Sequence, residues 1–274
     1  MTWLHIDPHK CNKDAICVAE CPSAVIRMHA PDGYPGLTPD ASEHCLYCGH
    51  CVAVCPEAAL TLDWLDPGAC PPVDPALSVS SHQAEQFLRS RRSIRTFKDQ
   101  PVEHERLEKL IEIACHAPSA KNQQPWHWVV VEDRDQVKRL AAMVIDWIRL
   151  AIRQEPETAK ERGLPRVVEQ WDRGDERICR GAPHVIVAHG DKSWPFGTQD
   201  CTLALSYLDL FAPTLGLGTC WGGYFFTAAN HYPPLSEALG IPPEHKAYGA
   251  MMVGYPRYRY HRLPLRKPPK VAWK

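Results

Sequence analysis

The stretch Cys45-Leu-Tyr-Cys48-Gly-His-Cys51-Val-Ala-Val-Cys55-Pro56 decides the fold of the N-terminal part of the chain. Three cysteines at this spacing lie on one tight turn and can grip three corners of an iron–sulfur cubane, while the fourth, followed by proline, serves a second cluster. Gly49 allows the backbone to approach the inorganic sulfides closely. A structural zinc site is the alternative, but such sites usually use two separated pairs of ligands. The spacing therefore favours a cubane.

A related motif precedes it, Cys11-Asn-Lys-Asp14-Ala-Ile-Cys17-Val-Ala-Glu-Cys21-Pro22, in which Asp14 stands where the second cysteine is expected. Short strands are predicted after each motif, at residues 24–29 and 59–64, so that two half-units repeat. Together the motifs resemble the bacterial two-cluster ferredoxins. The resemblance implies two ligand sets. One [4Fe-4S] cluster would be held by Cys45, Cys48, Cys51 and Cys21, and the second cluster by Cys11, Cys17 and Cys55 with Asp14 or no fourth ligand.

The second cluster depends on what Asp14 does. A carboxylate is a harder and weaker ligand than a thiolate for this iron, so that corner is expected to be labile. The site is then either a [4Fe-4S] cluster with an aspartate ligand or a [3Fe-4S] cluster. In the alternative interpretation, Asp14 is a solvated turn residue beside an iron-deficient site.

Composition limits the class of protein. The 274 residues are 45% hydrophobic and 23% charged, which excludes a largely disordered chain, and at ~150 residues per domain they predict about two domains. The net charge of −1 gives no general attraction to nucleic acid or to a membrane. The chain lacks a long apolar run and its start does not resemble a signal peptide, so we expect a cytoplasmic protein. Twelve cysteines in a reducing compartment indicate metal binding rather than disulfides.

The domain boundary is marked by proline. Four prolines between residues 66 and 75 favour an extended connector, and Ser80-x-x-Gln83 is a capping-box start for a helix. We therefore predict an iron–sulfur domain at residues 1–65, a linker at 66–79 and a larger domain at 80–274. Residues 1–65 carry eight acidic and three basic side chains, which indicates either a basic redox partner or ordinary surface solubility.

Two motifs in the larger domain point to a phosphorylated heterocycle. Arg91-Arg92-Ser93-Ile94-Arg95-Thr96-Phe97 offers forked guanidinium donors and hydroxyls that suit a phosphate monoester, although a solvated basic turn is the simpler interpretation. After an expected helix at 103–116, the loop Ala117-Pro-Ser-Ala-Lys-Asn-Gln-Gln-Pro-Trp-His-Trp128 leads into a strand and offers amide groups to a flat ring.

These two motifs resemble the FMN-binding signature of the nitroreductase family. The resemblance covers residues 80–274, because Arg180–Ala188 is similar to the family's central strand and Gly216–Gly223 to its flavin-facing turn. It implies an α+β fold: a ferredoxin-like iron–sulfur domain followed by an α+β sandwich whose central, mostly antiparallel sheet is flanked by helices. The implied FMN-binding residues are Arg91, Arg92, Ser93, Arg95, Pro118, Ser119, Ala120, Asn122, Gly222, Gly223 and Arg266.

The combined motifs predict an oxidoreductase. Electrons would enter through the clusters, collect on FMN and leave as hydride to an electron-poor nitro compound, quinone or activated alkene. Chemistry centred on the flavin needs no catalytic side chain. One alternative is the reverse flow, in which NAD(P)H is oxidised and electrons are exported; another is a sensor of oxygen or iron. The resemblance also implies a homodimer with the flavin at the subunit interface.

Two segments lie outside these motifs. Residues 140–180 combine an amphipathic stretch with a charged one and are expected to form a mobile lid that sets the substrate. Trp147, Trp171 and Trp194 would line an aromatic slot or pack in the core. The last 18 residues carry seven basic side chains and no acidic one. This charge suits binding of the FMN phosphate, contact between subunits or docking of the acidic iron–sulfur domain better than binding of nucleic acid. The expected partners are an external electron donor, either ferredoxin or NAD(P)H, and a small-molecule substrate.

Overall fold

The computed structural model describes residues 2–29 and 33–274. They form two compact units: one comprises the chain up to Val79 together with Lys121–Gln123, and the other comprises Ser80–Ala120 and Gln124–Lys274. Within the described ranges, no helix is both long and apolar enough to span a membrane.

The first unit is built from short elements around a small core. Its helices are α1 (Ile16–Ala19), α2 (Ala41–His44) and α3 (His50–Ala53), and its strands are β1 (Leu4–Ile6), β2 (Ile26–Met28), β3 (Pro35–Leu37) and β4 (Leu60–Leu62). The strands expected at 24–29 and 59–64 are β2 and β4. Each pairs antiparallel with a different partner, β2 with β3 and β4 with β1. The helices that begin after the cysteine turns are thereby fixed against two small ribbons.

The segment between the units contains two single turns of 3₁₀ helix, η1 (Pro67–Ala69) and η2 (Pro75–Leu77). An aspartate precedes each turn. Oδ1 of Asp66 accepts a hydrogen bond from the amide of Gly68 at 2.7 Å, and Oδ1 of Asp74 accepts one from the amide of Ala76 at 2.8 Å. These local bonds order the turns although their side chains are largely exposed.

The second unit is a layered α+β domain, as predicted. Its helices are α4 (Ser81–Ser90), α5 (His104–Ala114), α6 (Arg134–Gln154), α7 (Pro156–Glu161), α8 (Leu164–Asp172), α9 (Gly197–Phe211), η4 (Ala212–Leu215), α10 (Gly223–His231) and α11 (Pro233–Ala238). The short turn η3 (Ala120–Asn122) begins in this unit and ends in the segment that groups with the first unit. Its strands are β5 (His127–Val131), β6 (His184–Asp191), β7 (Gly218–Trp221) and β8 (His245–Gly254). The sheet order is β5-β6-β8-β7, and every neighbouring pair is antiparallel.

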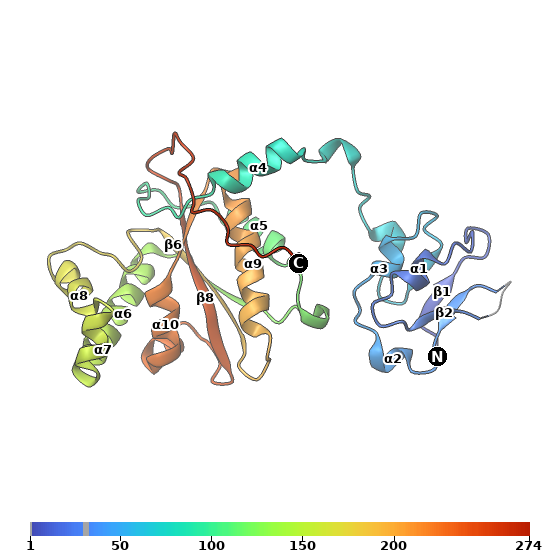
Figure 1. Cartoon of the computed structure of the whole chain (residues 1–274). Coiled ribbons are helices and arrows are strands. Elements are labelled where there is room, and N and C mark those ends of the chain that lie inside the picture. The colour runs from blue at the N-terminus through green and yellow to red at the C-terminus, as the bar shows by residue number, and fades with distance from the viewer. Residues whose placement is uncertain (1, 30–32) are drawn as a thin grey trace. The chain divides into compact units, whose positions relative to one another are not determined.

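Side-chain alternation along β6 explains the layers. Val185 and Val187 pack into the core that α6, α8 and α10 cover, whereas Ile186 and Ala188 pack into the core beneath α5 and α9. Because successive strand residues point to opposite faces, a strand covered on both sides must be apolar throughout. Figure 1 shows α10 on one side of β8 and α9 on the other.

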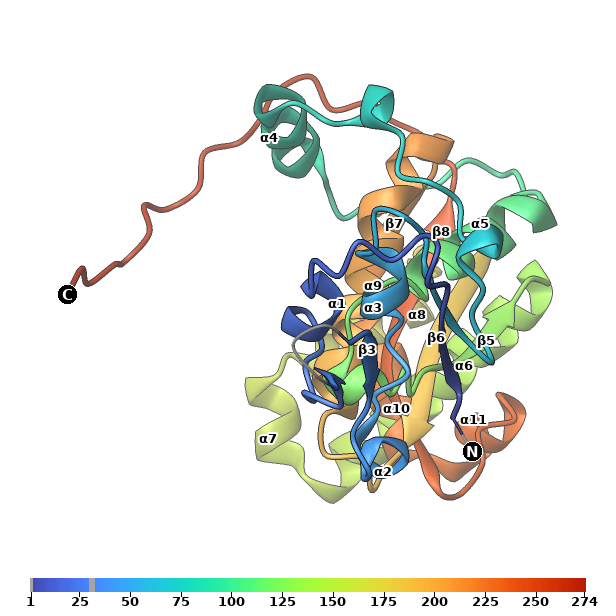
Figure 2. The same ribbon diagram turned by 90° about the vertical axis from the view of Figure 1, so that its right-hand side faces the viewer.

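Helix starts follow the sequence signals. At α4, Ser80 and Gln83 form the predicted capping box, and at α6, Oδ1 of Asp133 accepts a hydrogen bond from the amide of Gln136 at 2.6 Å. The region 140–180, expected as an amphipathic stretch and a charged lid, is folded into α6, α7 and α8. After β8 the chain has no regular structure, and Figure 2 shows it leaving the sheet as an extended tail.

Candidate functional site

The first cysteine set surrounds a cavity in the first unit. Cys21, Cys45, Cys48 and Cys51 all line it. Gly49 has a φ of 71° at the start of α3, which lets the chain turn between the second and third cysteines. The amide of Tyr47 donates to Sγ of Cys45 at 3.4 Å. Amide donors of this kind stabilise the negative charge on a cluster sulfur.

The second predicted set surrounds a separate cavity, lined by Cys11, Asp14, Cys17 and Cys55. The amide of Ala59 donates to Sγ of Cys55 at 3.3 Å. Oδ1 of Asp14 accepts a hydrogen bond from the amide of Ile16 at 3.1 Å, which fixes the carboxylate at the start of α1. Asp14 therefore shares one cavity with three cysteines, where a fourth ligand would stand.

The two predicted donor sets each surround a cavity. Within residues 2–29 and 33–274, no three His, Cys, Asp or Glu side chains are arranged to hold one metal ion. The thiols instead line cavities, as a cubane requires. Burial, together with smaller contributions from the nearby thiols of Cys48 and Cys21, raises the pKa of the Cys51 thiol to about 11. Iron supplies the positive charge that converts such thiols into thiolates.

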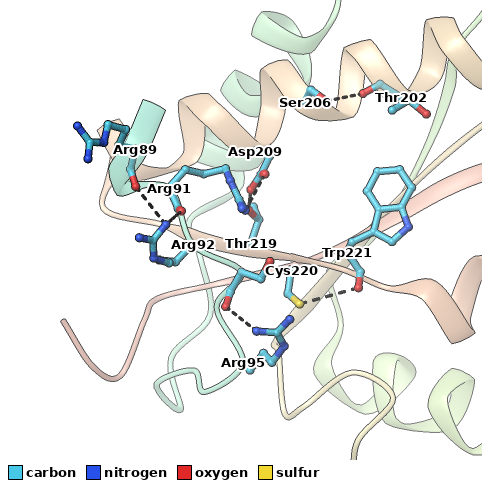
Figure 3. Close-up of polar contacts among 11 residues, drawn as sticks. Arg89, Arg91, Arg92, Arg95, Thr202, Ser206, Asp209, Thr219, Cys220 and Trp221 are labelled. Atoms are coloured by element: carbon cyan, nitrogen blue, oxygen red, sulfur yellow. Dashed lines mark hydrogen bonds and ion pairs between the residues drawn. The ribbon is translucent and has the colours of Figure 1, made fainter. Parts of the chain in front are cut away.

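The basic motif of the second unit is fixed by α9 and β7 (Figure 3). Nη1 of Arg91 lies 3.3 Å from Oδ2 of Asp209, whose other oxygen accepts a hydrogen bond from the Thr219 hydroxyl. Ser93 forms a β-bridge with Thr219, and the amide of Ile94 donates to the Thr219 carbonyl at 2.8 Å. Sequence reasoning missed Asp209, although an acidic residue among the apolar residues of α9 is a usable signal.

Arg92 is engaged with the main chain. Its Nη1 donates to the carbonyl oxygens of Arg91 at 2.6 Å and Arg89 at 3.1 Å, so it satisfies acceptors at the C-terminal end of α4. Its Nε is buried without a hydrogen-bond partner in the described structure. Arg95 differs, because it lines a pocket and its Nη1 donates a hydrogen bond to the Ser93 carbonyl at 3.4 Å.

Two cavities divide the predicted FMN-binding residues. A pocket of about 570 Å³ is lined by Arg95 and Gly223, together with Trp147, Arg180, Cys220 and Trp221 among others. A second cavity of about 690 Å³ is lined by Arg91, Arg92, Gly218, Thr219 and Arg257 among others. The remaining predicted residues of the second unit line neither cavity: Ser93, Pro118, Ser119, Ala120, Gly222 and Arg266. Asn122 groups with the first unit, and Arg266 lies in the exposed tail.

The loop that carries Pro118, Ser119 and Ala120 is held by a buried carboxylate. Asp200 is 2% exposed; its Oδ1 accepts a hydrogen bond from the amide of Ala120 at 2.9 Å, and its Oδ2 accepts one from Nε1 of Trp194 at 2.8 Å. Trp194 therefore braces this loop. Of the three tryptophans considered for an aromatic slot, only Trp147 lines the 570 Å³ pocket, and Trp171 packs against the core.

The electrostatics of the 570 Å³ pocket suit an anionic flavin. Burial raises the pKa of the Cys220 thiol, while the positive charges of Arg95, Arg180 and Arg91 act to lower it. Three guanidiniums thus act on one buried position of β7. The charges of Arg91 and Arg95 beside indole and phenol walls fit a phosphorylated aromatic ring system such as FMN, and Arg180 adds a further positive charge to the pocket. Arg180 was not predicted as a site residue from the sequence.

Comparison with known proteins agrees with this geometry. The nitroreductase family model matches residues 88–255, and the 4Fe-4S dicluster domain model matches residues 4–56. An NADH dehydrogenase of Thermus thermophilus is 30% identical over 200 residues, covering 67% of this chain and 92% of that protein. An FMN reductase (NAD(P)H) of Bacillus subtilis is 27% identical over 179 residues, covering 65% and 67%.

Among solved structures, a nitroreductase with bound FMN from Bacteroides fragilis has a TM-score of 0.58 at 20% identity, covering 70% of this chain and 99% of that one. This likeness shows the fold. The family match spans more than half of the chain. The chain therefore belongs to the nitroreductase family, as a flavin-dependent oxidoreductase with an N-terminal 4Fe-4S ferredoxin-like domain.

Proposed function

We propose that this protein is an FMN-dependent reductase that receives electrons singly through two iron–sulfur clusters and delivers them in pairs to an electron-poor small molecule. The observation that carries the proposal is the presence, in one chain, of two cavities lined by seven cysteines and Asp14 and of a cationic pocket on a nitroreductase fold. Because a flavin unit alone does not require iron–sulfur clusters, the fusion of the two units supports electron transfer between them.

The residues proposed to hold FMN have separate tasks. Arg91, Ser93 and Arg95 would bind the phosphate and the ribityl chain, with Arg266 as a further phosphate ligand. Pro118, Ser119, Ala120 and Asn122 would border the isoalloxazine, and the backbone at Gly222 and Gly223 would face its N5 side. FMN bound there supplies the exchange between one-electron and two-electron transfer and the hydride itself. The protein positions both ring systems and supports the charge that develops.

The proposed substrates share one stoichiometry. Reduction of a nitro group to a nitroso group takes two electrons and two protons and releases water, and reduction of a quinone takes the same four particles. The external donor supplies both electrons, in two one-electron steps. Solvent supplies the protons that do not arrive with the hydride. No protein side chain is consumed.

The second cluster is proposed to be either a [4Fe-4S] cluster with Asp14 as its fourth ligand or a [3Fe-4S] cluster. The position of the Asp14 carboxylate in the cavity of Cys11, Cys17 and Cys55 supports a role near the iron. Its hydrogen bond from Ile16 supports either form, because it orients the carboxylate whether or not iron occupies that corner.

A second candidate function is NAD(P)H oxidation with export of electrons through the clusters. It is favoured by the names of two relatives, an NADH dehydrogenase and an FMN reductase (NAD(P)H). Both functions use the same cofactors and differ in which end receives the electrons.

An anaerobic absorbance titration distinguishes them. Holoprotein is titrated with NADH, with NADPH or with reduced ferredoxin while the flavin and cluster bands are followed separately. The proposed function predicts bleaching of both chromophores by ferredoxin, followed by reoxidation when a nitroaromatic or quinone is added. Rapid bleaching by NAD(P)H with none by ferredoxin contradicts it and supports electron export.

A further inference from the structure

Arg180 lines the 570 Å³ pocket from an uncommon backbone conformation. Its φ is 56°, in the left-handed region that residues other than glycine rarely occupy, and Gly181 follows with a φ of 69°. Such conformations are energetically unfavourable and persist where the surrounding structure imposes them, commonly at binding sites. The residue in this uncommon conformation therefore also lines the pocket.

Glu176 holds this turn in place. Its Oε1 accepts a hydrogen bond from the amide of Cys179 at 2.6 Å, and its Oε2 accepts one from the amide of Gly181 at 2.9 Å. One carboxylate therefore grips the main chain on both sides of Arg180. Ile178 and Cys179 are each only 2% exposed, which anchors the turn in the core. The guanidinium of Arg180 is thus presented from a fixed backbone.

The charge of the pocket is unbalanced. Its lining contains four arginines, Arg95, Arg162, Arg177 and Arg180, and one carboxylate, Glu155. Arg177 is neutralised by Asp175 at 2.7 Å. Across the described ranges, neither Arg162 nor Arg180 has a carboxylate oxygen within 4 Å. Guanidiniums without a counter-ion in a partly enclosed pocket bind anionic groups, most strongly as bidentate pairs with carboxylate or phosphate.

The walls of the same pocket are aromatic. Trp147, Trp221, Tyr224 and Phe226 line it, and the rings of Trp221 and Phe226 meet edge to face with centroids 5.9 Å apart. Flat apolar walls favour a flat ring as ligand. The pocket therefore offers stacking surfaces and an unpaired cation together.

We propose that Arg180 is the anion anchor for the substrate of this enzyme, and that the substrate class is an electron-poor ring bearing a carboxylate or a similar anionic group. The inference rests on the proposed reductase function and narrows it. FMN phosphate is assigned to Arg91, Ser93 and Arg95, so Arg180 is left for a second anion. Glu176 is a positioning residue that acts through the backbone of Arg180.

The test compares two nitroaromatic ligands of similar size, one anionic and one neutral. Oxidised holoprotein without any electron donor is titrated by calorimetry with 4-nitrobenzoate and with the neutral 4-nitrobenzyl alcohol. We expect the carboxylate to bind about tenfold more tightly, as one charge-assisted pair provides. Arg180→Gln should remove this preference, weakening only 4-nitrobenzoate and leaving the FMN content unchanged. Glu176→Gln should weaken 4-nitrobenzoate by a smaller factor.

Arg166→Gln is the matched control, because Arg166 is exposed on α8 and does not line the pocket. It should bind both ligands as the unaltered protein does. Equal affinity of the two ligands in the unaltered protein overturns the inference. So does loss of FMN in Arg180→Gln, which would assign Arg180 to the cofactor. Calorimetry measures binding without turnover. If no donor supports reductase activity, the proposed function fails, but the preference for the anionic ligand can still be measured.

Discussion

Asp14 is the residue on which the nature of the second cluster depends. It lines the cavity of Cys11, Cys17 and Cys55 with its carboxylate fixed by the Ile16 amide. Asp14→Cys supplies a fourth thiolate, which iron binds more strongly than a carboxylate. We expect any three-iron electron paramagnetic resonance signal of the oxidised protein to be lost and a four-iron signal to increase on reduction. Glu57→Gln, an exposed change, should leave the spectrum unaltered. An unchanged spectrum in Asp14→Cys contradicts the ligand assignment.

Arg95 carries the prediction for the flavin. Its guanidinium faces the 570 Å³ pocket, and no carboxylate of the described chain lies within 4 Å of it. Loss of one charge-assisted phosphate contact should weaken FMN binding about tenfold or more. Arg95→Ala should therefore lose FMN on dilution while its cluster absorbance stays intact. Arg89→Ala removes an exposed arginine paired with Glu85 and should retain FMN. Equal flavin content in both variants would refute the role of Arg95.

His184 gives a prediction for stability. It is 2% exposed, its Nδ1 bonds the Glu132 carbonyl at 2.9 Å, and its Nε2 accepts a hydrogen bond from the Val102 amide at 2.8 Å. Burial lowers the pKa of His184 below its usual 6.5. The unfolded chain therefore binds more protons, and the stabilisation is lost as the pH falls below 6.5.

The free energy of unfolding, measured by denaturant titration between pH 8 and pH 5, should fall as the pH drops below 6.5, by at most about 1.4 kcal/mol per pH unit on account of this histidine. His184→Gln should be less stable at pH 8 and should lack this part of the slope. Substitution of the exposed His261 should change neither. A slope identical in His184→Gln and the unaltered protein contradicts the assignment.

At the scale of elements, signals that act within a few residues were predictable. The capping box at Ser80 and the cap at Asp133 each need side chains only three residues apart. Contacts between elements were not. Asp209 on α9 pairs with Arg91, which lies 118 positions away in the sequence. Glu176 positions the main chain at Arg180 by accepting hydrogen bonds from two backbone amides, and this geometry depends on a left-handed turn. Spacing along a sequence does not report such contacts.

The cap of α6 can be tested directly. Asp133 accepts the Gln136 amide at 2.6 Å, and removing such a cap typically costs about 1 kcal/mol. Asp133→Ala should lower the free energy of unfolding by that amount. Asp135→Ala is the control, because Asp135 forms a surface pair with Lys138 and caps nothing. Its effect should stay within about 0.5 kcal/mol, as for most surface pairs. Equal losses in both variants contradict the capping account.

For the molecule as a whole, the sequence predicted both fold units, the antiparallel sheet and the two cysteine sets. It did not predict that the proposed FMN residues divide between two cavities, since motif spacing specifies which residues are present but not how tertiary packing distributes them. The structure also shows two large apolar side chains exposed on α9, because Tyr207 is 39% exposed and Leu203 is 41% exposed.

We propose that these exposed side chains belong to the subunit interface of the homodimer that the family resemblance implies. Burying them against a second copy would remove apolar surface from water, and a charge placed there would oppose association. Tyr207→Glu should shift the sedimentation of the protein from dimer toward monomer, and FMN should be lost in parallel. Cluster absorbance should persist. Val73→Glu, in the connector between the units, is the comparison, because Val73 is 94% exposed and lines neither flavin cavity. A monomeric variant that retains FMN contradicts a flavin site shared between subunits.

The central claim is that one chain holds two iron–sulfur clusters and FMN. The most direct measurement is the iron, acid-labile sulfide and FMN content of anaerobically purified protein, determined per chain on a single preparation. The account predicts about seven to eight iron atoms, about eight acid-labile sulfides and about one FMN. Zinc in place of iron, absence of sulfide, or protein without flavin would contradict it.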